Sequence, residues 1–119
     1  MTEISIRRVH DGVPPGWHPI LVDRLWPRGV RKADLAGVTW LKQVGPSSEL
    51  RTWFGHDPER FDEFAQRYRA ELTGPSAVAF TELLDEVRGY DRVVLMYSAK
   101  DTGHNQAVVL AELLRQQLT

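Results

Sequence analysis

Short apolar runs and alternating apolar residues predict four strands along the chain. Ile4 and Ile6 alternate with polar neighbours, and residues 20–22 form a continuous apolar run of the kind that a sheet buries. Near the C-terminus, residues 93–97 are apolar and rich in β-branched side chains, which is typical of a strand covered on both faces. The predicted strands are residues 3–9, 18–25, 38–44 and 93–97.

Helical spacing of apolar residues predicts helices in the remaining segments. Ser47 is a candidate cap for a short helix that runs through Trp53, and Asp57 followed by Pro58 is typical of a helix start. The apolar faces of three longer helices are Phe61, Phe64, Ala65, Tyr68 and Leu72, then Phe80, Leu83, Leu84 and Val87, then Ala107, Leu110, Ala111, Leu114 and Leu118. Residues 73–76 separate the first two, which we expect to form an antiparallel pair.

The order of these elements predicts the fold class. A strand, a polar loop and a helix at the C-terminus make half of a βαβ unit, and earlier strands are available to complete the sheet. With 119 residues, the chain has the length of one domain. We therefore expect a single α/β domain over residues 1–119, in a three-layer, Rossmann-like arrangement with a small, mostly parallel sheet flanked by helices.

Composition and charge narrow the function classes. The chain has no cysteine, which excludes disulfides, thiolate metal sites and a thiol nucleophile. No run approaches the length of a membrane span, and residues 1–3 lead directly into a predicted strand, so we expect a soluble cytoplasmic protein with no signal peptide and no membrane partner. The net charge of −1 argues against a general nucleic-acid-binding protein, which is normally basic.

Polar segments at the predicted strand ends are where an α/β fold places its ligands. Residues 23–29 follow the second strand, residues 46–57 follow the third, and residues 97–105 follow the last. Residues 24–53 contain six basic and two acidic residues, although the whole chain is slightly acidic. Guanidinium groups match the geometry of phosphate and carboxylate, and a helix N-terminus favours anions. The candidate anion-binding residues are Arg24, Arg28, Arg51, Lys100 and Asn105.

Structural roles compete with these functional ones. Arg24 and Arg28 can equally form internal ion pairs, and for Asp23 a structural role, holding Arg28 or a loop amide in place, is favoured over catalysis. His104 is a candidate acid or base because imidazole changes its charge near neutral pH, and it can also simply bond to its own loop. The candidate catalytic residues are His104, Tyr97 and Asp23, and the expected pocket-lining residues are Trp26, Ser98, Asp101 and His56.

Signatures of bound cofactors and metals are missing. The patterns GxxxxGK[ST], GxGxxG and GxSxG do not occur, and neither HExxH nor an EF-hand loop is present. We therefore predict no cofactor and no metal. All four tryptophans lie in the first half among the basic residues; they can stack on nucleobases or on arginine, but we expect core packing for Trp40 and Trp53 and a pocket-facing Trp26.

The same polar segments carry a family resemblance. The motif DRLWPRG at residues 23–29, the pairs at 46–47, 50–51 and 53–54, HDP at 56–58, and YSAKD at 97–101 with His104 and Asn105 resemble the YeaO-like branch of the domain of unknown function 488 family. The resemblance covers nearly the whole chain. It implies a compact bacterial or archaeal cytoplasmic α/β protein with Rossmann-like layering, and it implies no activity.

These observations favour a pocket for a phosphate, nucleotide or carboxylate at the carboxyl edge of the sheet, in a protein that is a transferase or hydrolase if it is an enzyme. One alternative is a nucleic-acid-binding module that uses the basic, tryptophan-rich segment. A second is a non-enzymatic protein-interaction module. The sequence leaves the oligomeric state, substrate and reaction open.

Overall fold

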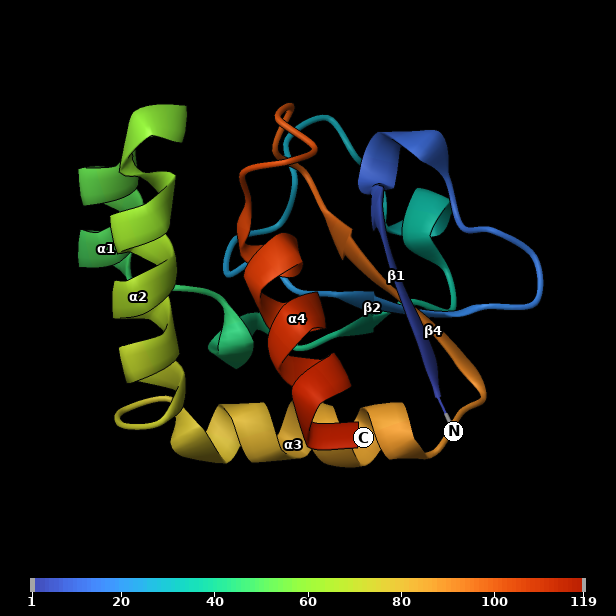
Figure 1. The fold of residues 1–119 in the computed structure, drawn as a ribbon. Coiled ribbons are helices and arrows are strands. Elements are labelled where there is room, and N and C mark those ends of the chain that lie inside the picture. The colour runs from blue at the N-terminus through green and yellow to red at the C-terminus, as the bar shows by residue number, and fades with distance from the viewer. Residues whose placement is uncertain (1, 119) are drawn as a thin grey trace.

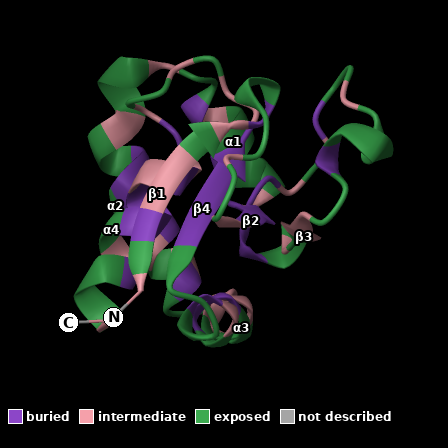
Figure 2. Cartoon of the chain, turned by 90° about the vertical axis from the view of Figure 1, so that its right-hand side faces the viewer, coloured by how far each residue is buried: buried purple, intermediate pink, exposed green. Residues whose placement is uncertain are grey.

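A four-stranded parallel sheet forms the centre of the computed structural model, which describes residues 2–118. The strands are β1 (Glu3–Arg8), β2 (His18–Leu21), β3 (Thr39–Trp40) and β4 (Arg92–Tyr97). They lie in the order β1-β4-β2-β3, and every neighbouring pair is parallel. Figure 2 shows this order, with the central strand β4 buried along most of its length. The α/β fold with a small parallel sheet is confirmed.

The α-helices share one hydrophobic core with one face of the sheet. They are α1 (Ser48–Phe54), α2 (Phe61–Leu72), α3 (Ala77–Arg88) and α4 (Gln106–Leu118). Because strand side chains alternate between faces, Val93, Leu95 and Tyr97 of β4 enter this core. The predicted apolar stripes supply the other side, with Phe64, Tyr68, Leu83 and Leu110 among the buried residues.

Within residues 2–118, no α-helix contributes to the buried cluster on the opposite face of the sheet. Val94 and Met96 of β4 and Leu21 of β2 pack there against Val9 and Leu35. Val9 and Leu35 belong to two short 3-10 helices, at Val9–Asp11 and Lys32–Leu35. The outer layer of this face therefore consists of connecting segments, and these include the segment that follows β2.

The first three strands end earlier than predicted, whereas β4 ends at Tyr97 as predicted. The second strand ends at Leu21 rather than at residue 25: the Val22 N–H still donates to Met96, but at Asp23 a side chain takes over the contact to the neighbouring strand. The third strand has only two residues before the chain turns into a 3-10 helix at Lys42–Val44. Because β2 and β3 end early, the segments that follow them lie at the carboxyl edge of the sheet.

Helix boundaries follow the predicted caps. The Ser47 hydroxyl accepts a hydrogen bond from the Leu50 N–H and caps α1, and Asp57 caps a 3-10 turn at Pro58–Arg60 that leads into α2. The antiparallel pairing of α2 and α3 is wrong. Figure 1 shows α3 running across the end of α2 instead of alongside it, because the apolar residues of α2 face α1 and α4 while α3 passes beneath the sheet.

No helix within residues 2–118 has both the length and the apolar character needed to cross a membrane.

Candidate functional site

A cleft of about 320 Å³ opens where the carboxyl ends of β2 and β4 meet the first turn of α4. We call it the β2–β4 cleft. Its lining residues are Asp23, Arg24, Leu25, Trp26, Pro27, Arg28, Pro46, Arg51, Phe54, His56, Phe64, Ser98, Ala99, His104, Asn105 and Gln106. All of these residues except Phe64 and Gln106 come from the three polar segments that the sequence places at strand ends. Parallel strands bring such segments together at one edge of the sheet.

Asp23 is the buried carboxylate of the cleft, with a relative exposure of 7%. Its Oδ2 accepts a hydrogen bond of 3.1 Å from the Ser98 N–H, and its Oδ1 accepts one from the Gln106 side-chain amide. Burial raises the pKa of Asp23, and the hydrogen bonds from Ser98 and Gln106 and the charge of Arg51 oppose this shift. Asp23 therefore joins the end of β2 to β4 and α4, and it bonds to a loop amide rather than to Arg28.

Arg24 connects the segment after β2 with the segment before α1. Its Nε donates to the Pro46 carbonyl at 2.8 Å, and one of its terminal nitrogens donates to the Gly45 carbonyl at 2.7 Å. Gly45 makes this approach possible, because a Cβ atom there would lie 2.8 Å from the Arg24 backbone nitrogen. Arg24 thus lines the cleft while two of its donors bind the backbone.

The start of α1 is fixed by α2. The Glu71 carboxylate accepts hydrogen bonds from the Ser47 N–H at 2.9 Å and from the Ser47 hydroxyl at 2.5 Å. The buried Tyr68 hydroxyl donates to the Val44 carbonyl at 2.5 Å. These contacts hold the N-terminus of α1, and Arg51 extends from the next turn of that helix to the cleft.

Arg28 and Arg51 are the cations of the cleft that have no acceptor. Within residues 2–118, neither guanidinium group makes a hydrogen bond or an ion pair, and both residues are exposed. The lining contains three arginines and only one carboxylate, that of Asp23. Because the first turn of α4 adds its partial positive charge at the same place, the cleft favours an anion.

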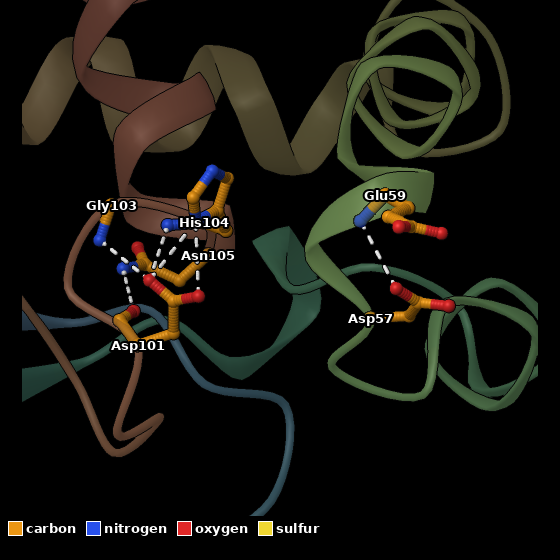
Figure 3. A network of polar contacts seen from close by, with 6 residues as sticks. All are labelled: Asp57, Glu59, Asp101, Gly103, His104 and Asn105. Atoms are coloured by element: carbon orange, nitrogen blue, oxygen red, sulfur yellow. Dashed lines mark hydrogen bonds and ion pairs between the residues drawn. The ribbon is translucent and has the colours of Figure 1, made fainter.

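His104 is oriented by Asp101 at the entrance to α4. Its Nδ1 lies 2.9 Å from Asp101 Oδ2, and its ring edge contacts Phe61. Figure 3 shows His104, Gly103 and Asn105 gathered around Asp101, each joined to it by a hydrogen bond. The hydrogen bond from the Gly103 N–H lowers the pKa of Asp101 below its ordinary value, and His104 makes smaller contributions in the same direction. His104 also lines the cleft, and within residues 2–118 its Nε2 makes no hydrogen bond.

Asn105 caps α4 from its buried position. Its side-chain amide donates to the Asp101 carbonyl at 2.9 Å, and its Oδ1 accepts from the Val108 N–H at 3.2 Å. Its relative exposure is 1%. Both ends of this side chain are therefore occupied by the protein, which makes Asn105 part of the scaffold of the cleft.

His56 has a left-handed backbone, with φ of 58°. It follows Gly55, which ends α1 in the same conformation, and its ring lies 6.3 Å from that of Phe54. Residues other than glycine rarely adopt this conformation. The turn brings the imidazole of His56 to the cleft.

Three residues from the sequence-based site do not line the cleft. Tyr97 lies in the helix-side core with 2% exposure, and this burial raises its pKa. Lys100 is exposed on the loop after β4, and Asp101 lies behind His104. The lining does contain Asp23, Arg24, Trp26, Arg28, Arg51, His56, Ser98, His104 and Asn105.

Several lining residues were not predicted from the sequence. Gln106 contacts Asp23, which is 83 positions away along the chain. Its place just after a polar loop was the only available signal. Leu25, Phe54 and Phe64 give the cleft an apolar part, and Leu25 is 60% exposed at its rim. The sequence signal for Leu25 is its place within the polar segment that follows the second strand.

Cationic side chains lie over three of the four tryptophan rings. Arg92 lies over Trp17, Lys42 over Trp40, and Arg60 and Arg67 over Trp53. The expectation of core packing is wrong for Trp40, which is 36% exposed because β3 is a two-residue strand at the edge of the sheet. Each contact places a cation over one face of the ring at a distance typical of a cation–π interaction.

A family model described as the inactive DUF488-N3 subclade matches residues 3–119. The chain belongs to this family. Two similar relatives are described as uncharacterised proteins. The Escherichia coli protein YeaO is 40% identical over 113 residues, which cover 94% of this chain and 96% of YeaO. The Mycobacterium tuberculosis protein Rv3073c is 41% identical over 114 residues, which cover 95% of this chain and 94% of Rv3073c. No solved structure matches the chain.

Proposed function

We propose that the β2–β4 cleft binds a small anion, such as a phosphate, a nucleotide or a carboxylate, and that the protein acts by binding rather than by catalysis. One observation carries the proposal: Arg28 and Arg51 line the same cleft, and neither has a hydrogen-bond or ion-pair partner within residues 2–118. Guanidinium groups form strong, directional hydrogen bonds with phosphate and carboxylate oxygens. A bound anion would supply the missing acceptors.

The surroundings of the two arginines support the same ligand. His56 and His104 place two further nitrogen donors on the lining, and the first turn of α4 lies beside them. The description of the family as inactive supports a role without catalysis. The buried position of Tyr97 agrees with this, because it leaves one of the three candidate catalytic residues without access to a ligand.

A hydrolase or transferase is the second candidate function. The observation that favours it is the contact between His104 Nδ1 and Asp101, since a carboxylate that orients an imidazole is a frequent arrangement in acid–base catalysis. Incubation with phosphomonoesters and phosphodiesters tests it. Turnover that His104→Ala removes would support this candidate, and absence of turnover would leave the binding function.

Thermal unfolding tests the binding proposal directly. The melting temperature is measured in increasing inorganic phosphate, nucleoside monophosphate or dicarboxylate, with sodium chloride keeping the ionic strength constant. A ligand that binds only the folded protein raises its stability by about 2.7 kcal/mol at a concentration of 100 times Kd. We expect a saturable rise with at least one of these anions. If all three act no differently from chloride, the proposal is wrong.

A further inference from the structure

We infer that the anion is a phosphorylated polyol or sugar, a ligand that presents hydroxyl groups as well as a phosphate. This inference rests on the proposed function and makes it more specific. It comes from the uneven chemistry of the cleft, where donors without a partner and acceptors with remaining hydrogen-bonding capacity lie on different lining residues. The donors are Arg28 and Arg51, and the acceptors are Asp23 and Gln106.

Asp23 retains acceptor capacity inside the cleft. An ionised carboxylate offers about four acceptor positions. The Ser98 N–H, the Ser98 side chain and the Gln106 amide occupy three of them. The side-chain nitrogen of Gln106 donates its hydrogen bond to Asp23. Within residues 2–118, the side-chain oxygen of Gln106 has no hydrogen-bond partner. Two acceptors therefore remain for groups of the ligand that donate hydrogen bonds.

A plain anion does not match these acceptors. A phosphate oxygen next to Asp23 would meet a carboxylate that is 7% exposed, and the two negative charges would repel each other. The phosphate therefore belongs beside Arg28 and Arg51. A hydroxyl group can donate to Asp23 and to Gln106, and a site with such acceptors discriminates strongly against a ligand that lacks the hydroxyl.

The size and the apolar part of the cleft fit the same ligand. A volume of about 320 Å³ corresponds to roughly ten water molecules at ~30 Å³ each, so inorganic phosphate would fill less than about half of it. Leu25, Phe54 and Phe64 line the remaining space. Their side chains offer contact to a short carbon skeleton, and the polar lining offers contact to its substituents.

A matched pair of ligands tests the inference on the unmodified protein. Glycerol phosphate and propyl phosphate have carbon chains of equal length and differ in their hydroxyl groups. Titration calorimetry should show glycerol phosphate binding about tenfold more tightly. Equal affinities would overturn the inference while leaving anion binding intact. If inorganic phosphate and both esters fail to bind, the inference is wrong, and the nucleotide and dicarboxylate arms of the thermal unfolding test decide the proposed function.

The variant Asp23→Asn tests whether Asp23 causes the preference for glycerol phosphate over propyl phosphate. An amide in place of the carboxylate should reduce the preference for glycerol phosphate to about threefold or less, while propyl phosphate binds at least as tightly as before. The matched control is Asp62→Asn, the same change on an exposed position of α2. It should leave the tenfold preference unchanged. A preference that survives Asp23→Asn would contradict the role of Asp23, and if this variant does not fold, the ligand pair on the unmodified protein decides.

Discussion

The arginines at the two ends of the parallel sheet are in opposite states of pairing. At the amino end, His18 Nε2 lies 2.9 Å from Glu86, its ring stacks on Tyr90 at 3.6 Å, and Arg92 pairs with Glu3 at 3.6 Å. At the carboxyl end, Arg28 and Arg51 line the β2–β4 cleft and have no ion pair within residues 2–118. Both ends combine histidine and arginine with an aromatic or apolar surface.

The difference teaches that charge alone does not mark a site. A shallow hollow at the amino end is lined by His18, Tyr90 and Arg92, but the protein itself supplies their partners. Paired groups stabilise the fold, whereas unpaired cations in a concave site are available for a ligand. The predictions below test whether this contrast holds.

Removing both open arginines should have the largest effect on binding. The double variant Arg28→Ala/Arg51→Ala should weaken phosphate-ester binding about 100-fold or more, because each charge-assisted hydrogen bond contributes about 1.5–3 kcal/mol. Arg92→Ala removes an arginine at the amino end and should leave the affinity within about twofold. Titration calorimetry compares the variants. Equal losses from the two ends would remove the contrast.

Gly45→Ala should destabilise the carboxyl end. The added Cβ would lie 2.8 Å from the Arg24 nitrogen and 3.1 Å from the Arg24 Cα, so the backbone must shift at a cost of about 1–3 kcal/mol. Gly103→Ala is the matched control, since the nearest atom to its Cβ is 3.8 Å away. Chemical denaturation measures both free energies of unfolding. A Gly45→Ala variant as stable as the control would show that this close approach is unimportant.

The two carboxylates near the cleft should affect stability with opposite pH dependence. The folded-state pKa of Asp23 lies above the ordinary 3.8, so the folded protein keeps a proton that the unfolded chain releases, and stability falls as pH rises from 3.8 through the raised pKa. The pKa of Asp101 is lowered, so its stabilising effect is present above 3.8 and is lost as pH falls through the folded-state pKa.

Urea denaturation of two variants between acidic and neutral pH tests these signs. Relative to the unmodified protein, Asp23→Asn should become progressively more stable as pH rises. Asp101→Asn should become progressively less stable than the unmodified protein as pH rises from the lowered pKa of Asp101 through 3.8. Parallel pH profiles for the two variants would contradict the opposite shifts.

The smallest effect is expected at the amino end. Glu86→Gln weakens a partly exposed pair with His18 and should lower the free energy of unfolding by less than about 1 kcal/mol. Because this pair is remote from the β2–β4 cleft, affinity for phosphate esters should not change. Thermal unfolding with and without ligand measures both quantities. A loss of ligand binding would show that the two ends are coupled.

Local patterns predict the elements better than their arrangement. The apolar spacing of Phe64, Tyr68 and Leu72 gives the helix at 61–72, and Ser47 and Asp57 give the caps, because these features act over a few residues. The crossing of α2 and α3 depends instead on how each helix packs against distant elements, and no local pattern encodes it.

The same distinction applies to the site. Arg28, Arg51 and His104 lie in segments that follow parallel strands, and the carboxyl ends of such strands meet at one edge of the sheet. Because α/β folds bind their ligands at this edge, the sequence predicts that the three residues come together. The burial of Tyr97 could also have been predicted from the sequence. Every second side chain of a strand lies on the same face, so Tyr97 shares a face with the apolar residues Val93 and Leu95, and this face packs against the helices. The backbone bonds of Arg24 and the contact between Gln106 and Asp23 required the tertiary structure.

The most direct test of the account is an NMR titration that follows backbone amides as glycerol phosphate is added at constant ionic strength. The account predicts saturable shift changes at Arg51, His56, Ser98 and His104, with His18 and Arg92 unchanged. Changes centred on His18 and Arg92, or weak changes that never saturate at either end, would contradict it.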